Sequence, residues 1–234
     1  MIEDKFLSCI ITAAGSGLRM KSKVNKPYIE ISGKKILEIT LDTITSINEI
    51  DEIILVIRPD DEDFVRDILK KYPRSIKYVY GKNTRELSTF EGLKALSDES
   101  DLVLTHDGVR PFASRELFLK TIESLKDNKA VITATKSKDT VKIVDDRMYV
   151  DFTPNRDYVY NIQTPQAFDK RLIFSMYEDY IKSEFKVTDD SQLFEFFDRK
   201  EPVKVVHGEY SNVKITTQED IIFARAFLER EKDV

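Results

Sequence analysis

Short runs of consecutive apolar residues alternate, along the first 135 residues, with segments in which apolar residues recur every three or four positions. A continuous apolar run is typical of a strand buried in a parallel sheet, whereas the wider spacing gives a helix one apolar face. The predicted strands are residues 6–13, 52–57, 76–80, 102–105 and 130–135. The predicted helices are residues 36–47, 61–72, 84–96 and 115–125. This repeated β-α-β order predicts an α/β fold with a mostly parallel sheet and helices on both faces.

Residues 138–160 interrupt this order. Apolar and polar positions alternate in residues 141–144 and 148–152, which predicts a β-hairpin that projects from the main sheet as an arm. The elements predicted after it are helices at 170–182 and 189–198, strands at 203–207 and 213–216, and a final helix from 217. Because no linker or repeat divides the chain, we predict a single domain over residues 1–234 with an inserted β-hairpin arm at about 138–160.

The amino-acid composition argues against several classes of function. The 37 Lys and Arg residues against 42 Asp and Glu residues give a net charge of −5, which argues against binding of nucleic acid or of an anionic membrane. No apolar run approaches the roughly 18 residues of a membrane helix. Cys9 is the single cysteine and His106 and His207 are the two histidines, so no internal disulfide and no cysteine- or histidine-built metal site is expected. Without a targeting signal, the expected location is the cytoplasm.

The segment after the first predicted strand, residues 13–20, reads Ala-Ala-Gly-Ser-Gly-Leu-Arg-Met. Gly15 and Gly17 would let the backbone approach a ligand closely and turn N–H groups toward an anion, and Arg19 and Lys26 add positive charge. The segment lacks the Gly-Lys-Ser/Thr of a phosphate-binding P-loop and the third glycine of a dinucleotide fingerprint. The two interpretations are a phosphate-binding loop and a tight turn with solvated charges.

Other candidate residues follow later predicted elements. Asp107 and Arg110 come after the strand at 102–105, where ligands of open parallel sheets bind. Asp107 could hold a ribose hydroxyl or a metal, and Arg110 could hold a phosphate. Alternatively, the two residues form an ion pair that orders a loop. His106 is expected to be structural. Ser88 on a predicted helix and Lys214 in a short strand are weak signals when taken alone.

No Ser-His-Asp or Cys-His set can be assembled from this sequence. Phosphoryl and nucleotidyl transfer do not require one, because a phosphate monoester is already an anionic nucleophile at neutral pH. The protein must then supply alignment and positive charge, which glycine-rich loops with arginine and lysine provide.

Taken in order, seven segments of the chain resemble the 2-C-methyl-D-erythritol 4-phosphate cytidylyltransferases. They span residues 10 to about 220, nearly the whole sequence. The segments are residues 13–20, 26–31, 106–112, 138–142, 163–168, 188–190 and 212–216.

The resemblance implies a Rossmann-like nucleotidyltransferase fold and a homodimer. It implies transfer of CMP from CTP to a polyol phosphate with Mg²⁺, held mainly by the CTP phosphates with Asp107 as the candidate protein ligand. The implied CTP-binding residues are Ala13, Ala14, Gly15, Ser16, Gly17, Gly81, Ser88 and Asp107. The implied catalytic cations are Arg19, Lys26 and Lys214. The residues implied for the polyol phosphate are Arg110, Thr140, Thr188 and, from the arm of the partner subunit, Arg156.

The acceptor has two interpretations. Residues 138–140 and 188–191 are similar to the methylerythritol branch, whereas residues 154–156 and 208–212 are similar to the D-ribitol-5-phosphate cytidylyltransferases. The sequence also departs from the family pattern after the third strand, where Gly81 is followed by lysine and asparagine instead of glycine and an acid.

Two alternatives come from other functional classes. One is a nicotinamide-dependent oxidoreductase, based on Gly15 and Gly17 with Glu38 about 20 residues further on. The missing third glycine opposes it. The other is a nucleotide-binding module without catalysis, which the set of Arg19, Lys26 and Lys214 opposes.

Overall fold

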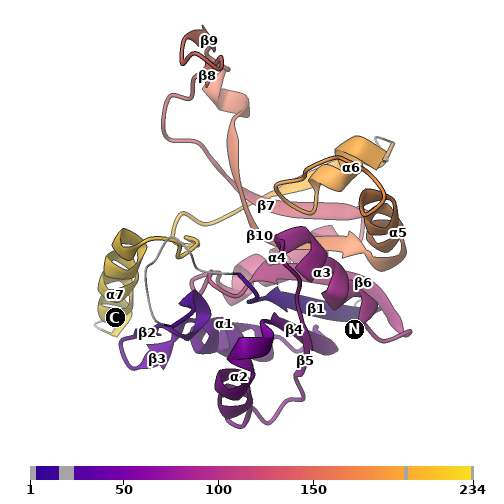
Figure 1. Cartoon of the computed structure of the whole chain (residues 1–234), viewed down its shortest axis with the longest axis vertical. Coiled ribbons are helices and arrows are strands. Elements are labelled where there is room, and N and C mark those ends of the chain that lie inside the picture. Colours follow the sequence, from indigo (N-terminus) through magenta and orange to yellow (C-terminus); the bar gives the residue numbers. More distant parts are fainter. Residues whose placement is uncertain (1–3, 16–23, 198–199, 233–234) are drawn as a thin grey trace.

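A computed structural model describes residues 4–15, 24–197 and 200–232 of the chain. Its centre is a single large sheet (Figure 1). The sheet has seven strands in the order β11-β7-β10-β6-β1-β4-β5. The strands are β1 (Phe6–Thr12), β4 (Glu52–Ile57), β5 (Lys77–Tyr80), β6 (Ser100–Asp107), β7 (Ala130–Lys136), β10 (Tyr160–Asp169) and β11 (Val203–His207). Within this sheet only β10 runs antiparallel to its neighbours, so the predicted mostly parallel α/β fold is confirmed.

Helices cover both faces of the sheet because side chains of a strand alternate between them. In β1, Leu7, Cys9 and Ile11 pack in one apolar cluster and Ile10 in the other. The first cluster joins α1 (Ile36–Thr45), α2 (Glu62–Leu69) and α4 (Arg115–Ser124). The second joins α3 (Arg85–Lys94), α5 (Lys170–Tyr180) and α6 (Gln192–Phe197). A smaller cluster packs α7 (Gln218–Lys232) beside the short hairpin of β2 (Glu30–Ile31) and β3 (Lys34–Lys35).

The starts of three helices follow from capping residues in the sequence. Thr84, Ser114 and Asp169 precede α3, α4 and α5, and each side-chain oxygen accepts a hydrogen bond from the backbone N–H three residues later. Such caps satisfy N–H groups that the first helical turn leaves without partners. They therefore fix where each helix leaves the edge of the sheet.

One expected strand is wrong and one observed strand was not expected. Residues 213–216 do not form a strand, although Ile215 N–H donates to the Val109 carbonyl at 2.9 Å. The central strand β10 was not predicted at all, because its polar residues and Pro165 break the apolar pattern. A register shift between Gln163 and Gln166 accommodates that proline, which has no N–H to donate to a ladder.

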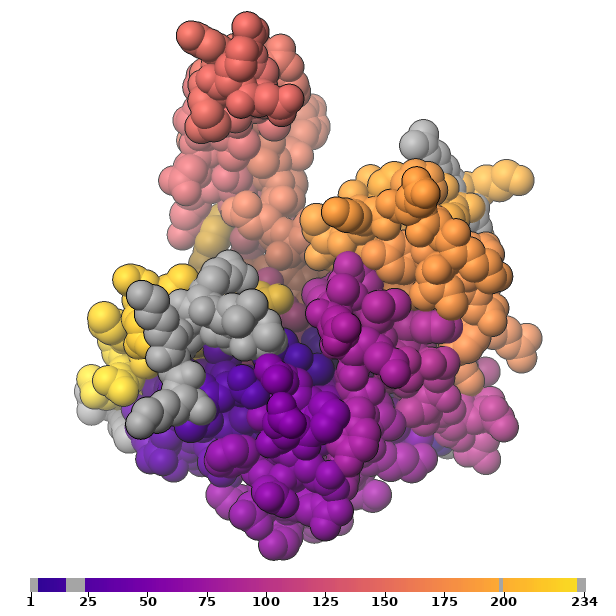
Figure 2. All heavy atoms as spheres, in the orientation of Figure 1, coloured from indigo at the N-terminus to yellow at the C-terminus, as the bar shows by residue number. Residues whose placement is uncertain are grey.

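The predicted β-arm is confirmed as a projecting hairpin. Strands β8 (Ile143–Val144) and β9 (Val150–Phe152) form its tip, which stands away from the body in Figures 1 and 2. The Asp145 carboxylate accepts hydrogen bonds from the N–H groups of Arg147 and Tyr149 and closes the turn. Large apolar side chains of the arm are at least 42% exposed: Ile143, Val144, Met148, Tyr149, Val150, Phe152 and Tyr158.

Across the described ranges, none of the helices combines the length and the apolar character needed to cross a bilayer. The cytoplasmic location stays a prediction. Cys9 is fully buried, and burial raises the pKa of its thiol to about 12, so it remains protonated at neutral pH.

Helix α3 lies close against the sheet at Gly92. A Cβ atom built there would lie 2.6 Å from Ile10 Cγ2 and 3.0 Å from Val56 Cγ2, both on buried side chains. We therefore expect Gly92→Val to lower the free energy of unfolding by about 2 kcal/mol or more through overpacking. Urea denaturation measures the change. Lys94→Val places the same side chain at an exposed position of α3 and should cost less than about 1 kcal/mol; equal losses would contradict the close approach.

Candidate active site

A cavity with a volume of about 800 Å³ opens where the parallel strands β6, β1, β4 and β5 end. This edge is where ligands bind in open α/β sheets, and the volume suits a nucleotide-sized ligand. We call it the carboxyl-edge cavity. Its lining is Thr12–Gly15, Lys26, Pro27, Arg58–Asp60, Gly81–Arg85, Ser88, Asp107, Val109, Lys214 and Thr216.

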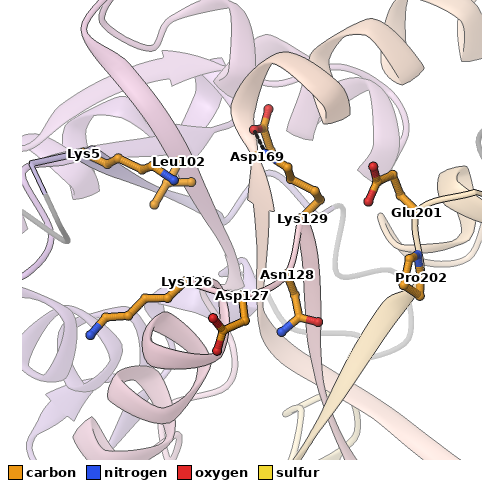
Figure 3. A pocket seen from close by; sticks show the side chains of 9 residues that line it. All are labelled: Lys5, Leu102, Lys126, Asp127, Asn128, Lys129, Asp169, Glu201 and Pro202. Carbon is orange, nitrogen blue, oxygen red and sulfur yellow. Dashed lines mark hydrogen bonds and ion pairs between the residues drawn. The ribbon is translucent and has the colours of Figure 1, made fainter.

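A second, smaller hollow of about 230 Å³ lies at the opposite edge of the sheet, where β6 and β7 begin (Figure 3). Lys5, Lys126 and Lys129 line it together with three acids, and Lys129 is paired with Asp169 at 3.4 Å. Positive and negative charges balance around this hollow, and it is small for a nucleotide. The chemistry therefore favours the carboxyl-edge cavity.

Asp107 lies at the end of β6 and is 6% exposed. Lys214 Nζ lies 3.1 Å from both of its carboxylate oxygens, and Arg110 Nε donates to Oδ2 at 3.0 Å. Burial alone would raise the pKa of this carboxyl, but Lys214, Arg85 and Arg110 outweigh burial and hold the pKa well below its usual range. Asp107 is therefore ionised and oriented by two cations.

Lys214 reaches Asp107 because its loop is tied to β10 and to the turn that follows β6. Asn212 is fully buried, and its Nδ2 donates to the Thr164 carbonyl at 2.8 Å. On the other side of Lys214, Ile215 N–H donates to Val109. Gln163 Nε2 on β10 also donates to the Asn212 carbonyl at 3.2 Å, so a polar side chain that concealed this strand in the sequence helps to hold a cavity lysine in place.

His106 is 1% exposed and lies behind Asp107. The Arg110 carbonyl lies 3.2 Å from its Nε2 and can only accept, so Nε2 carries the proton. Nδ1 then accepts from the Thr164 hydroxyl at 3.0 Å, which itself accepts from Asp107 N–H at 3.0 Å. Burial lowers the pKa of the imidazole to about 4, and the neighbouring carboxylate of Asp107 only partly opposes this. This neutral, fully bonded ring agrees with the expected structural role.

Lys26 begins a short 3-10 turn, Lys26–Tyr28, whose second position is Pro27. The turn is fastened on both sides: Asn25 Nδ2 donates to Asp61 Oδ1 at 2.6 Å, and the Tyr28 ring stacks on Phe64 at 5.3 Å. These contacts place Lys26 at the same cavity as Lys214.

Gly81, Ala14 and Ser88 form one wall of the carboxyl-edge cavity. A Cβ at Gly81 would lie 2.6 Å from Ala14 Cβ and 2.7 Å from Ser88 Oγ, so glycine is required for this packing. The Ser88 hydroxyl is 3.0 Å from Lys82 N–H, which donates to it, and 2.7 Å from the Thr84 carbonyl. Ser88 therefore shapes the loop that lines this wall.

Several expected site residues lie elsewhere. Arg110 does not line the cavity; its guanidinium binds Asp107 and donates to the Asn212 carbonyl at 2.9 Å. Thr140 and Arg156 are exposed on the arm, and Thr188 is exposed and bonded to Gln192. Their roles toward a polyol phosphate stay predictions. Three expected residues lie outside the described ranges: Ser16, Gly17 and Arg19.

Arg85 was missed by sequence reasoning. It is the first residue of α3, lines the cavity and forms a two-pronged ion pair with Asp190 at 3.1 Å. A usable signal was present, because a Thr-capped helix start directly after a predicted strand places its first side chains near the ligand edge.

The oxidoreductase interpretation depended on an acid at Glu38. That carboxylate does not line the cavity; it accepts from Lys35 N–H at 2.7 Å and is paired with Lys71. These contacts hold the Glu38 carboxylate at the start of α1.

Comparison with known proteins places the whole chain among similar proteins. A family model described as 2-C-methyl-D-erythritol 4-phosphate cytidylyltransferase matches residues 7–230. A protein of that name from Clostridioides difficile (strain 630) is 40% identical over 227 residues, with 96% of this chain and 94% of the relative covered.

Solved structures agree. The crystal structure of 4-diphosphocytidyl-2C-methyl-D-erythritol synthase from Anaerococcus prevotii DSM 20548 is 77% identical, has a TM-score of 0.90 and covers 96% of both chains. The structure of 2-C-methyl-D-erythritol 4-phosphate cytidylyltransferase from Thermus thermophilus is 27% identical with a TM-score of 0.77, covering 95% of this chain and 98% of the other. The similarity therefore includes the arm as well as the sheet.

The low pKa of His106 predicts a pH dependence of stability. An unfolded histidine takes up a proton below about pH 6.5, whereas the folded His106 resists protonation until about pH 4. The free energy of unfolding should therefore fall by about 3 kcal/mol as pH drops from 6.5 to 4. Urea titrations at several pH values measure this slope. His106→Gln should remove that contribution and exposed His207→Gln should keep it; an unchanged slope in His106→Gln would refute the assignment.

Proposed function

Because this chain belongs to the 2-C-methyl-D-erythritol 4-phosphate cytidylyltransferase family, we propose that it transfers CMP from CTP to 2-C-methyl-D-erythritol 4-phosphate. Pyrophosphate is the second product, and the CDP-polyol serves isoprenoid precursor synthesis. The observation that carries this conclusion is the family match over residues 7–230. The carboxyl-edge cavity, lined by Lys26, Arg58, Lys82, Arg85 and Lys214, supports it with a cationic setting for a triphosphate.

The reaction needs no base from the protein. A phosphate oxygen of the acceptor attacks the α-phosphorus of CTP, a new P–O bond forms, and the bond to the bridging oxygen of the β-phosphate breaks. The electron pair of that bond leaves with pyrophosphate. Since the acceptor phosphate is already anionic near neutral pH, the protein acts by aligning the reactants and stabilising charge.

We propose that Lys26 and Lys214, with Arg19, neutralise the charge that develops on the transferring phosphate. Lys214 is held by Asp107, which fixes the direction of its ammonium group before the substrate binds. Such a preorganised cation stabilises a transition state without reorganisation during the reaction. Ala13–Gly17, Gly81, Ser88 and Asp107 form the proposed cytidine side.

The proposed cofactor is Mg²⁺, carried mainly by the CTP phosphates. Within the described ranges, no group of three or more His, Cys, Asp or Glu side chains could hold a metal ion, but Asp60 and Asp107 line the cavity. This donor set fits Mg²⁺, which usually keeps several waters and binds one or two carboxylates plus substrate phosphates. Asp107 is the candidate ligand. When bound, Mg²⁺ supplies charge neutralisation at the phosphates.

We propose that the chain works as a homodimer assembled through the β-arm. A two-stranded ribbon is marginally stable in water, and this arm exposes seven large apolar or aromatic side chains of at least 42% exposure. A symmetric contact with a second copy would cover them. It would also carry the exposed Arg156 toward the acceptor side of the partner's cavity.

The function is tested by measuring pyrophosphate release with two acceptors side by side. We expect kcat/KM for 2-C-methyl-D-erythritol 4-phosphate to exceed that for D-ribitol 5-phosphate by about 10-fold or more. CTP should exceed ATP by a similar factor, because we propose that the closely packed wall of Ala14, Gly81 and Ser88 forms a base subsite that fits a cytosine better than a purine. A preference for ribitol phosphate would move the chain to the related branch, and equal use of ATP would contradict the cytidine subsite.

The dimer is tested by mixing two inactive variants. We expect Lys26→Ala to lower kcat by about 100-fold, because its cation acts where charge develops. If Arg156 serves the partner's site, heterodimers of Lys26→Ala with Arg156→Ala contain one site that has both residues. Activity should then return to about a quarter of the wild-type value per total site, by random mixing of an isologous dimer. The control is each variant mixed with itself. No recovery despite subunit exchange, or a monomer in light scattering, would refute the arrangement.

A further inference from the structure

The Asp190 carboxylate is fully buried and accepts hydrogen bonds from three side chains. Arg85 Nη1 and Nη2 donate to its two oxygens, each at 3.1 Å. The Thr105 hydroxyl donates at 2.8 Å and the Tyr177 hydroxyl at 2.5 Å. Both oxygens are therefore satisfied by two donors each, which is the condition under which a buried charge is tolerated.

Two partners of Asp190, Arg85 and Thr105, belong to different parts of the cavity's surroundings. Arg85 begins α3 and lines the cavity wall that also includes Ser88. Thr105 lies on β6 two residues before Asp107. Asp190 itself follows Thr188, the residue predicted for the acceptor phosphate. One carboxylate thus joins the proposed cytidine wall, the strand of Asp107 and the proposed acceptor segment.

The neighbouring residue strengthens this junction. Asp189 Oδ2 accepts from Gln166 Nε2 at 2.9 Å and from Ser191 Oγ at 2.6 Å. Gln166 is 1% exposed on β10, so the acceptor segment is fixed to the central strand as well as to α3.

The charge of Arg85 explains why a carboxylate is needed here. The Arg85 side chain is 27% exposed at the cavity, and Arg85 contributes to the positive field at Asp107. Asp107 already holds Lys214 and Arg110. An Arg85 without Asp190 would compete with Lys214 for Asp107, because a guanidinium binds carboxylates in pairs of hydrogen bonds.

We propose that Asp190 is a positioning residue for the cytidylyl transfer. It holds Arg85 away from Asp107 and fixes the proposed cytidine wall relative to the Thr188 segment. This inference rests on the proposed function. A buried ion pair contributes little net stability compared with apolar residues of similar size, so a role in alignment and a role in stability can be separated by mutation.

Four variants and a control test the inference. Asp190→Asn, Arg85→Met and the double variant Asp190→Leu with Arg85→Met alter the pair. Glu52→Gln is the matched control, since Glu52 is also a buried carboxylate that accepts hydrogen bonds from three donors. These donors are Ser8, Lys77 and Ser97. Glu52 lies at the start of β4, at the end of the strand opposite the cavity. Tyr177→Phe removes a single donor from Asp190 and serves if Asp190→Asn does not fold.

The readouts are kcat and KM for each substrate, well below the melting temperature, together with the melting temperature itself. We expect Asp190→Asn to lower kcat/KM for both CTP and the acceptor by about 10- to 100-fold, as a small misplacement of reacting groups does. Arg85→Met and the double variant should show similar, non-additive losses, and the double variant should regain melting temperature without regaining activity. Tyr177→Phe should lower kcat/KM for both substrates by about 3-fold. Glu52→Gln should lose melting temperature but keep kcat/KM within about 2-fold.

If Asp190→Asn, like Glu52→Gln, kept kcat/KM within about 2-fold of the wild-type value, the inference would be overturned. The proposed function would not be affected by that result. Normal kcat/KM in Arg85→Met, or recovered activity in the double variant, would also overturn it. A wild-type protein that releases no pyrophosphate from CTP and 2-C-methyl-D-erythritol 4-phosphate would overturn the proposed function, and the inference with it.

Discussion

A negative charge buried at the end of the central strand β6 is the constraint on which the carboxyl-edge cavity depends. Moving an isolated carboxylate out of water is very unfavourable, so Asp107 requires positive partners at short range. Lys214 supplies one from a distant loop and Arg110 the other from the turn that follows β6. Meeting this requirement places the Lys214 ammonium group at the cavity with its direction fixed.

The antiparallel strand β10 makes that arrangement possible. It is inserted between β6 and β7, and its polar residues face the loops at the carboxyl edge of the parallel strands. Thr164 bonds both His106 and the N–H of Asp107, and Gln163 Nε2 donates to the Glu209 carbonyl at 2.8 Å. The polar residues of β10 therefore hold the loops around the cavity. The apolar clusters on both faces of the sheet supply the packing that stabilises the fold.

Sequence reasoning was strongest where burial is uniform. The strands at 52–57 and 130–135 are mostly apolar and buried along their whole length, and the structure has them as β4 and β7 with boundaries within one residue. Asp107 and Lys214 were named separately and lie 3.1 Å apart. Prediction failed at β10, where hydrogen bonding to loops overrides the apolar pattern of a central strand.

Prediction also failed for the Arg85–Asp190 pair. The two residues are separated by 105 positions, and neither local spacing nor propensity connects them. Only the packing of α3 against α5 and α6 brings them together. The same limit applies to Lys214, whose distance from Asp107 could not be obtained from sequence. Contacts between distant segments that are decided by polar side chains, rather than by apolar periodicity, lie beyond this kind of reasoning.

The place of β10 in the sheet also has a consequence for biosynthesis. Strands β1, β4, β5 and β6 all precede residue 108 and can pair as soon as they emerge. The second edge of β6 has no partner until residues 160–169 have been made, after the entire arm. A nascent or truncated chain that ends in the arm would thus present an open edge of buried-type residues, which is the kind of surface that invites pairing with other chains. Late insertion of one strand therefore extends the vulnerable interval of synthesis through α4, β7 and the arm.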